Sequence, residues 1–268
     1  MGVDPAWRRS AIERLLSGQR PDGGFGVQPY SKWKGGAHWR LVSLVELGIP
    51  AGNRAARSAA KAALGWIANP RHTAPVIKGL ERRHASIEGN AVAVCCRLGL
   101  ASSPQVKSLV EVLLRSQWRD GGWNCDRNPQ AHRSSFHETL APIRALVEYH
   151  RSTGDVRALK AAQRGGELLR EHRLYRSSRG ELINPEWLHV HWPHYWHYDY
   201  FHGLRAIAML GLMDDSRTDD ARQMLLAACR ADGTWCATGR RYWRPSTEVV
   251  NWGDAHQVVT PAALALLQ

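Results

Sequence analysis

The sequence has little that would place the protein in a membrane. Its apolar runs stay well short of the ~20 consecutive residues that a membrane-spanning helix requires, although 44% of its residues are hydrophobic. Residues 1–20 carry charges through an amphipathic pattern and lack the apolar centre of a signal peptide. We therefore expect a soluble, cytoplasmic protein with a proper core and no transmembrane segment.

Cysteine is scarce, and its count is odd. The sequence contains Cys95, Cys96, Cys125, Cys229 and Cys236, without the spacing of a disulfide framework. Reduced thiols are the simplest expectation. The adjacent pair falls in an apolar helix, which favours buried structural thiols over a nucleophile.

Several motifs with well-defined chemistry are absent. The glycine-rich turns lack Gly-Lys-Thr and Gly-x-Gly-x-x-Gly, so no nucleotide-binding loop is indicated. No Gly-x-Ser-x-Gly elbow is present, which argues against one large class of hydrolases. Cys-x-x-Cys and His-Glu-x-x-His, the compact zinc motifs, are missing as well.

Acidic residues are outnumbered by basic ones, which gives a net charge of +12. Such a charge attracts polyanions non-specifically. The arginines are scattered over predicted outer helices and form no basic stripe with interleaved aromatics, so we expect a solvated basic surface and no dedicated nucleic-acid face. One cluster, Arg240–Arg244, offers Arg241 to a diphosphate or carboxylate of a substrate, or else is a solvated loop.

What the sequence does contain is a repeated turn. Residues 15–25 and 113–123 both run from Leu-Leu through a glutamine to Asp-Gly-Gly and an aromatic residue. Residues 225–235 are a decayed third copy. A unit of helix, glycine turn and helix that recurs along the chain is typical of a repeat protein.

Helical periodicity covers almost the whole chain, and strand signals are nearly absent. The predicted outer helices span residues 5–17, 53–68, 104–117, 155–172 and 216–230. The predicted inner helices, which are more apolar, span residues 37–48, 86–99, 136–150, 194–211 and 254–267. Three of the inner helices end in Leu-Gly, where glycine can form a left-handed cap.

The inner helices repeat one apolar stripe. It comprises Leu41, Leu44 and Leu47, then Leu140, Ile143 and Leu146, then Leu204, Ile207 and Leu210. Hairpins of this length bury such stripes by stacking side by side. We expect an all-α fold, an α/α toroid or open arc of about five antiparallel helical hairpins, as a single domain over residues 1–268. Five units nearly close a ring, which leaves room for a partner subunit or a second copy.

The Gln-x-x-Asp-Gly-Gly-aromatic turn resembles the repeat shared by squalene–hopene cyclases, oxidosqualene cyclases and protein prenyltransferase β subunits. The resemblance follows the hairpin period along the chain, and three turns carry the motif. It implies an α/α toroid in which Gln19, Gln117, Trp123 and Trp235 tie outer helices together.

Polar, titratable residues occupy the first turn of every predicted inner helix. They are His38, beside Trp39, then Glu88 with the polar Asn90, then His137 and Glu138, then Asp199 and His202, and finally Asp254 and His256. Capping explains acidic residues there, but a helix N-terminus disfavours charged histidine. Because the inner helices run in one direction, we expect these tips to surround the mouth of a central cavity.

Ionised carboxylates beside neutral imidazoles are the protonation states that bind a divalent metal such as zinc. We expect His202, Asp254 and His256 to be the metal ligands if a metal is bound. His191, His194 and His197 would share one face if their segment is helical, with Pro193 as its first helical residue. Histidines that hydrogen-bond or stack among tryptophans are the alternative.

The resemblance to these families supports some of the candidate residues and argues against others. In protein prenyltransferases an Asp-x-Cys and a histidine hold zinc, and Asp254-Ala255-His256 has a similar spacing with histidine in place of cysteine. Cys125-Asp126 lies in a predicted loop in the wrong order. The Asp-x-Asp-Asp acid of class II terpene cyclases is absent, and Asp199 occupies a comparable place alone.

We therefore expect an enzyme with a Trp/His-lined cavity that carries out cyclisation, rearrangement or prenyl-type transfer on an apolar, isoprenoid-like small molecule. His137, Asp199, Glu138 and His38 are the catalytic candidates. Trp39, Trp196, Tyr198 and Trp252 would shape the pocket and stabilise cations. A sugar-processing α/α barrel with Glu138 and Asp199 as acid and base and a non-catalytic binding module are the alternatives.

Overall fold

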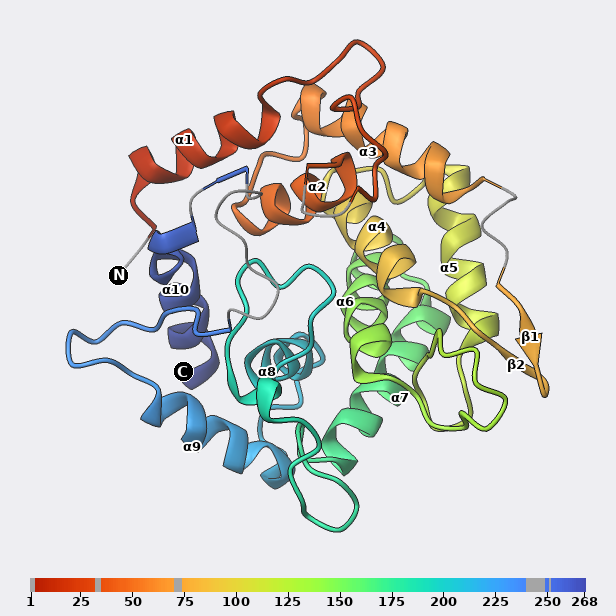
Figure 1. The fold of residues 1–268 in the computed structure, drawn as a ribbon, viewed down its shortest axis with the longest axis vertical. Coiled ribbons are helices and arrows are strands. Elements are labelled where there is room, and N and C mark those ends of the chain that lie inside the picture. The colour runs from red at the N-terminus through yellow and green to blue at the C-terminus, as the bar shows by residue number, and fades with distance from the viewer. Residues whose placement is uncertain (1–2, 32–34, 70–73, 240–248, 251) are drawn as a thin grey trace.

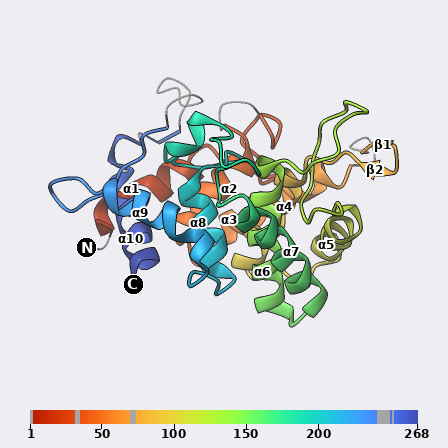
Figure 2. The ribbon, with the colours of Figure 1, turned by 90° about the horizontal axis from the view of Figure 1, so that it is seen from below.

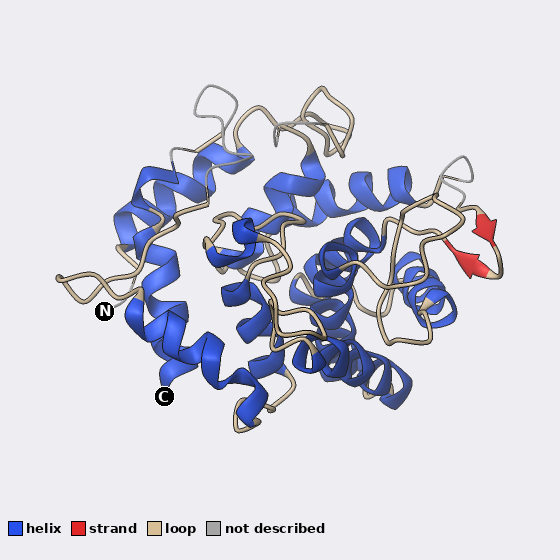
Figure 3. Cartoon of the chain, turned by 60° about the horizontal axis from the view of Figure 1, so that its bottom comes forward, coloured by secondary structure: helices blue, strands red, loops and turns tan. Residues whose placement is uncertain are grey.

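The computed structural model describes residues 3–31, 35–69, 74–239, 249–250 and 252–268. Within these ranges nearly all the regular secondary structure is helical, as expected, and Figure 3 shows the helices joined by loops, with one small pair of strands at the edge. The α-helices are α1 (Pro5–Leu16), α2 (Ala37–Glu46), α3 (Arg54–Ile67), α4 (Ala85–Arg97), α5 (Pro104–Ser116), α6 (Phe136–Thr153), α7 (Val156–Glu171), α8 (Tyr200–Met209), α9 (Asp219–Ala227) and α10 (His256–Leu267). No described helix is both long and apolar enough to cross a membrane.

One β-hairpin, which the sequence did not indicate, interrupts the helical pattern. Strands β1 (Val76–Ile77) and β2 (Leu80–Glu81) pair antiparallel between α3 and α4 and project at the edge of the molecule (Figures 1 and 3). The two-residue turn between them has positive φ at both Lys78 and Gly79. Two-residue hairpins favour such turns, and strands this short leave little periodicity in the sequence.

The helices alternate between the periphery and the interior. Figure 1 shows α1, α3, α5, α7 and α9 along the outside, with α2, α4, α6 and α8 inside them and α10 between α1 and α9. Figure 2 shows the same elements side-on. The first and last units also meet. The backbone N–H of Asp4 donates to Gln257 Oε1 at 2.9 Å, and the rings of Trp7 and Trp252 contact edge to face at 6.4 Å.

The apolar stripe predicted for the inner helices lies in the core. Leu44, Ile143 and Ile207 are completely buried, and of the nine stripe residues only Leu210 is partly exposed. The glycines that follow α2, α4 and α8 have φ near +71°, so the predicted left-handed caps are confirmed. Gly89 allows α4 and α6 to approach closely, because a Cβ there would lie 2.6 Å from the backbone of Ala141.

The α-helix bounds lie within about three residues of the prediction except at the start of α8. The predicted inner helix began at residue 194, whereas α8 begins at Tyr200. Asp199 has an extended backbone and its side chain accepts the N–H of His202, which caps the helix at this point. The expectation that Pro193 opens this helix is therefore wrong, and residues 191–197 form no helical face.

The glutamines of the repeated turns tie successive outer helices together. Gln19 Nε2 donates to the carbonyls of Gly23, in its own turn, and Ala55, in α3, at 3.0 and 2.9 Å. Gln117 repeats this arrangement with Gly121 and Ala161 of α7, at 2.7 and 2.8 Å. These bonds link each turn to the next outer helix and fix the spacing between outer helices.

The tryptophans of the turns form hydrogen bonds within their own helical hairpin. The indole N–H of Trp123 donates to the carbonyl of Leu113, and that of Trp235 donates to Leu225, at 3.0 and 2.7 Å. Each indole thus fastens its turn to the outer helix before it.

Glycine is required where these turns touch the next outer helix. Gly121 has φ +96°, and an added Cβ would lie 2.4 Å from the carbonyl oxygen of Arg164 in α7. Gly154 has a similar φ of +76° but open space around it.

We predict that Gly154→Ala lowers the free energy of unfolding by about 1–2 kcal/mol, from the left-handed backbone alone. Gly121→Ala should cost ~1–3 kcal/mol more, because of the clash. Urea unfolding of both variants measures the difference, and equal losses would contradict this account of the turn.

Candidate functional site

The histidine-rich segment, residues 189–199, lies across the N-terminal ends of the inner helices. The backbone oxygen of Tyr195 accepts a hydrogen bond from Asn90 Nδ2 of α4 at 2.7 Å. The Tyr195 ring packs edge to face on Trp39 of α2, with ring centres 5.3 Å apart. The segment therefore occupies the region where the sequence predicts the mouth of a cavity.

His137 of α6 is enclosed by aromatic rings from this region. Its Nδ1 accepts the backbone N–H of Tyr198 at 2.9 Å, and its ring lies 5.4 Å from that of Trp196. Burial lowers the pKa of His137 despite the opposing effect of the neighbouring Glu138. The Tyr198 hydroxyl donates to the Leu174 carbonyl at 2.7 Å and is fully buried.

Asp199 is buried completely, and its contacts are those of a helix cap. Oδ2 accepts the backbone N–H of His191 at 2.7 Å, and Oδ1 accepts that of His202 at 2.9 Å. Burial alone would raise the pKa of Asp199, but the hydrogen bonds and fields of His202 and His191 lower it overall. This environment favours the carboxylate, whereas a general acid requires a raised pKa.

His38 and His202 are held as neutral imidazoles in the interior. Burial lowers the pKa of His38 to about 3 and that of His202 to about 4. His202 Nε2 lies 2.8 Å from the carbonyl oxygen of His191, so this nitrogen carries the proton and donates. In this arrangement Nε2 is unavailable to a metal. His38 lies beside Trp39 with ring centres 4.7 Å apart.

The remaining predicted site residues lie elsewhere or outside the described part. Trp252 packs on Trp7, and His256 is the first residue of α10, partly exposed. Arg241 and the side chain of Asp254 fall outside the described residues. Among the residues that are described, His202 and His256 do not form a metal-ligating group with any third side chain.

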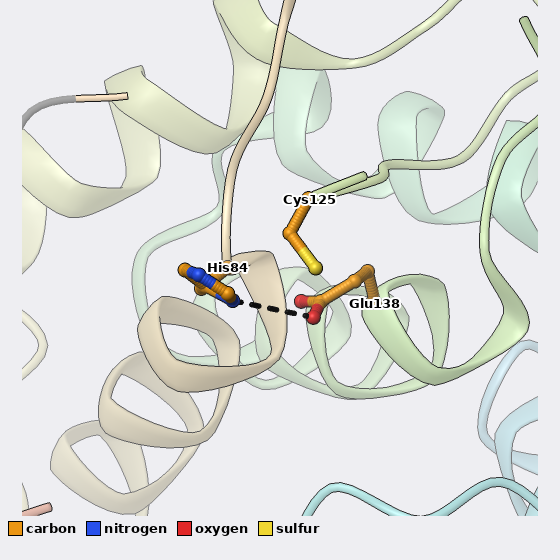
Figure 4. A group of neighbouring side chains, drawn as sticks. All are labelled: His84, Cys125 and Glu138. Atoms are coloured by element: carbon orange, nitrogen blue, oxygen red, sulfur yellow. Dashed lines mark ion pairs between the residues drawn. The ribbon is translucent and has the colours of Figure 1, made fainter. Parts of the chain in front are cut away.

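A different set of metal-ligating side chains does come together, and it includes the predicted Glu138. His84, Cys125 and Glu138 each offer a ligand atom, and the three atoms lie within 4.8 Å of one another (Figure 4). His84 Nδ1 is 3.7 Å from Glu138 Oε1. His84 precedes α4, Cys125 lies in the loop after α5, and Glu138 lies in the first turn of α6.

Backbone contacts bring these three residues together. The N–H of Arg83 donates to the carbonyl of Asn124 at 2.9 Å, which sets Cys125 beside His84. The N–H of Ser86 donates to Glu138 Oε2 at 2.8 Å, which joins α4 to α6. One oxygen of Glu138 is thus anchored, while Oε1 faces the imidazole and the thiol.

The pKa of His84 in this cluster is raised, whereas the pKa values of the interior histidines His38 and His202 are lowered. The neighbouring Cys125 and Glu138 side chains raise the pKa of His84 to about 10, despite partial burial. Contacts with His84 and Ser86 lower the pKa of the buried Glu138, although burial acts against this. A metal bound here would replace the proton of the imidazole.

A pocket of about 340 Å³ adjoins the cluster and has His84 in its wall. Its other lining residues include the aromatic pair Tyr30 and Trp66, whose rings stack in parallel with centres 5.9 Å apart. Burial raises the pKa of Tyr30 to about 12, with smaller contributions from Glu138 and Cys125. Tyr30 therefore remains a neutral phenol within reach of the charges of the cluster.

The sequence pattern placed Cys125 in a loop and in the wrong order for a zinc ligand, and no pattern pointed to His84 or to the pocket. Cys125 follows the second Asp-Gly-Gly-Trp turn by two residues, so the repeat itself fixes its place. That regularity was the available signal. The backbone pairing of Asn124 with Arg83 depends on the unpredicted hairpin before α4. No sequence pattern predicts this pairing.

A second pocket, of about 320 Å³, lies at the opposite ends of the inner helices. Residues from α2, α4, α6, α8 and α10 all line it. Glu46 is buried there between Arg144 and Arg205, with Arg205 Nη2 at 2.7 Å. Burial would raise the pKa of Glu46, but the two guanidinium groups lower it well below its usual value. Each of these three charges has a partner, which is typical of a structural network.

Comparison of the chain with models of protein families and with curated proteins found no match.

The neutral interior histidines predict an acid-sensitive fold. Above pH 6.5, the ordinary pKa of histidine, both the folded and the unfolded protein hold these imidazoles neutral. As pH falls from 6.5 towards 4, only the unfolded chain takes up protons. The free energy of unfolding then falls by about 1.4 kcal/mol per pH unit for each such histidine.

His38 provides a direct check of this pH dependence. Urea unfolding at pH 7 and pH 5 should show a smaller loss of stability in His38→Gln than in the wild type, by about 2 kcal/mol. The matched control is His132→Gln, because His132 is exposed and its replacement should leave the loss unchanged. If His38→Gln keeps the full loss, His38 is not neutral in the folded protein.

Proposed function

We propose that the protein is a metal-assisted enzyme whose active site is the pocket beside His84, Cys125 and Glu138, and that it acts on an apolar, isoprenoid-like small molecule by prenyl-type transfer, cyclisation or rearrangement. The observation that carries this proposal is that one member of a metal-ligand set, His84, lines a pocket whose wall also includes Tyr30 and Trp66. The interior carboxylate Asp199 lacks such an opening, because it is fully buried.

We further propose that the five hairpins form an α/α toroid. Two features support it. All five inner helices line the second pocket, and α1 approaches α10 through the contacts of Asp4 and Trp7. The glutamine bonds that join outer helices are those that the resemblance to cyclases and prenyltransferases implies.

The donor set suits zinc. A thiolate, an imidazole and a carboxylate are ligands that zinc accepts in one site, and three protein ligands leave the fourth position for water or substrate. His84 is the most exposed of the three residues and lines the pocket. Bound zinc would supply Lewis acidity and activate a coordinated nucleophile.

The protein's own residues supply binding and orientation. Tyr30, Trp66, Ile67 and Ile87 give the pocket an aromatic and aliphatic wall. Aromatic faces hold apolar chains and also stabilise cationic intermediates. Ser86 fixes the carboxylate of Glu138, so that its free oxygen keeps one orientation towards His84.

Metal analysis tests the ligand set. We expect purified protein to hold about one zinc ion per chain that a chelator removes. His84→Ala, Cys125→Ser and Glu138→Gln should each weaken zinc binding ~tenfold or more. The matched control is Cys229→Ser, since Cys229 is an exposed cysteine remote from the set. Zinc binding that survives all three substitutions would place the metal elsewhere.

Thermal stabilisation tests the substrate class. Geranyl or farnesyl diphosphate at ~100 times its Kd should stabilise the zinc-loaded protein by about 2.7 kcal/mol, seen as a rise in Tm. Trp66→Ala should reduce this rise, because Trp66 forms part of the apolar wall. The same ligands should be tested for turnover. Stoichiometric zinc without any stabilisation would leave a metal site but refute an isoprenoid substrate.

A further inference from the structure

Arg82 is a buried cation whose side chain has no hydrogen-bond partner among the described residues. It follows β2 and precedes the candidate metal ligand His84, and it is only 2% exposed. Its Nε, Nη1 and Nη2 atoms are all buried, and none has a hydrogen-bond partner in the described part of the chain. A guanidinium group carries five N–H donors, so leaving them unsatisfied in the interior costs much more than a lost neutral hydrogen bond.

The surroundings of Arg82 supply only a partial substitute for an anion. Its guanidinium carbon lies 4.7 Å from the centre of the Trp118 ring, a cation–π contact. The nearby carboxylates are engaged with the next residue, since Arg83 binds both Glu81 and Glu88. Arg83 is thus paired with acids, while Arg82 faces the same pocket without one.

A second unsatisfied atom faces this pocket. Glu88 lines it and is 8% exposed. Its Oε1 accepts from Arg83 Nε at 2.8 Å, whereas Oε2 is buried and has no partner among the described residues. The pocket therefore holds a guanidinium group that needs an acceptor and a carboxylate oxygen that needs a donor. Buried polar atoms in native proteins are normally satisfied, and a ligand can provide what the protein does not.

We propose that Arg82 and Glu88 form the subsite for the polar end of a ligand that carries an oxyanion beside an N–H or O–H donor. Arg82 binds the oxyanion and Glu88 Oε2 accepts from the donor. The apolar part of the ligand lies against Tyr30, Trp66 and Ile87 of the same pocket. An amino carboxylate and a protonated phosphate both have this chemistry. That this subsite binds a substrate rests on the proposed function. Ligand binding to it does not depend on the metal.

The test measures binding to chelator-treated protein by calorimetry. The probes are L-phenylalanine, 3-phenylpropanoate, which lacks the amino group, and inorganic pyrophosphate. Phenylalanine binding at least about tenfold more tightly than 3-phenylpropanoate supports an amino carboxylate. Pyrophosphate binding without phenylalanine binding supports a phosphate. In either case Arg82→Met should weaken the bound probe by at least about tenfold.

Arg82→Met also has an expected effect without ligand. Methionine fills much of the same space without a buried charge, so the ligand-free variant should have a higher Tm than the wild type. A merely structural arginine would give the opposite sign. The matched control is Arg119→Met, because Arg119 is exposed and lies outside the pocket; both binding and Tm should stay unchanged.

Several results would overturn the inference. One is the absence of binding for all three probes. Another is that phenylalanine and 3-phenylpropanoate both bind, with the same affinity. The third is a lower Tm, or undiminished probe binding, in Arg82→Met. Zinc content separates failure of this inference from failure of the proposed function. A wild-type protein that holds zinc but binds none of the probes would refute the subsite alone, and Arg82→Met should keep the zinc of the wild type.

Discussion

The structure depends on how the first two glycine turns meet the next outer helix. At Gly23 and Gly121 the backbone is left-handed, and the turn packs so closely on a neighbouring helix that a Cβ would collide with its backbone. This proximity lets Gln19 and Gln117 reach across and bond to α3 and α7. The spacing of the outer helices follows from these contacts.

The same turns also position the candidate site. After the second turn the chain pairs through Asn124 with Arg83, just before α4. Cys125 and His84 are thereby brought to one place, and the anchoring of Glu138 by Ser86 adds the third ligand. The site arises between adjacent repeat units, at the N-terminal ends of α4 and α6. This explains why it includes a residue of one predicted inner-helix tip but not the others.

Buried polar groups divide into two kinds in this protein. Glu46 is paired with two arginines, and Asp199 accepts backbone hydrogen bonds at both oxygens. These groups are satisfied and act as parts of the scaffold. The Arg82 side chain has no hydrogen-bond partner among the described residues at any of its three nitrogens, which costs more stability than a single unpaired atom elsewhere in the core. Departures of this kind are expected at functional sites.

Sequence patterns foresaw the helices because each carries a local signal. Caps such as Ser103 with Pro104, the repeated leucines and the Leu-Gly endings fix most bounds. The start of α8 was missed because the preceding aromatic and histidine residues are held by tertiary contacts, such as that of Asn90 with Tyr195. Of the three candidate metal ligands only Glu138 was foreseen, from its place in a first helical turn. The proximity of His84 and Cys125 rests on backbone pairing between distant segments, which has no local signature.

The central claim is that zinc lies between these three residues. Diffraction from crystals of the zinc-loaded protein, recorded above and below the zinc absorption edge, tests it most directly. The account predicts one anomalous peak within about 2.0–2.3 Å of His84 Nδ1, Cys125 Sγ and a Glu138 oxygen. A peak at the interior histidines around His202, or at no side chain of the set, would contradict it.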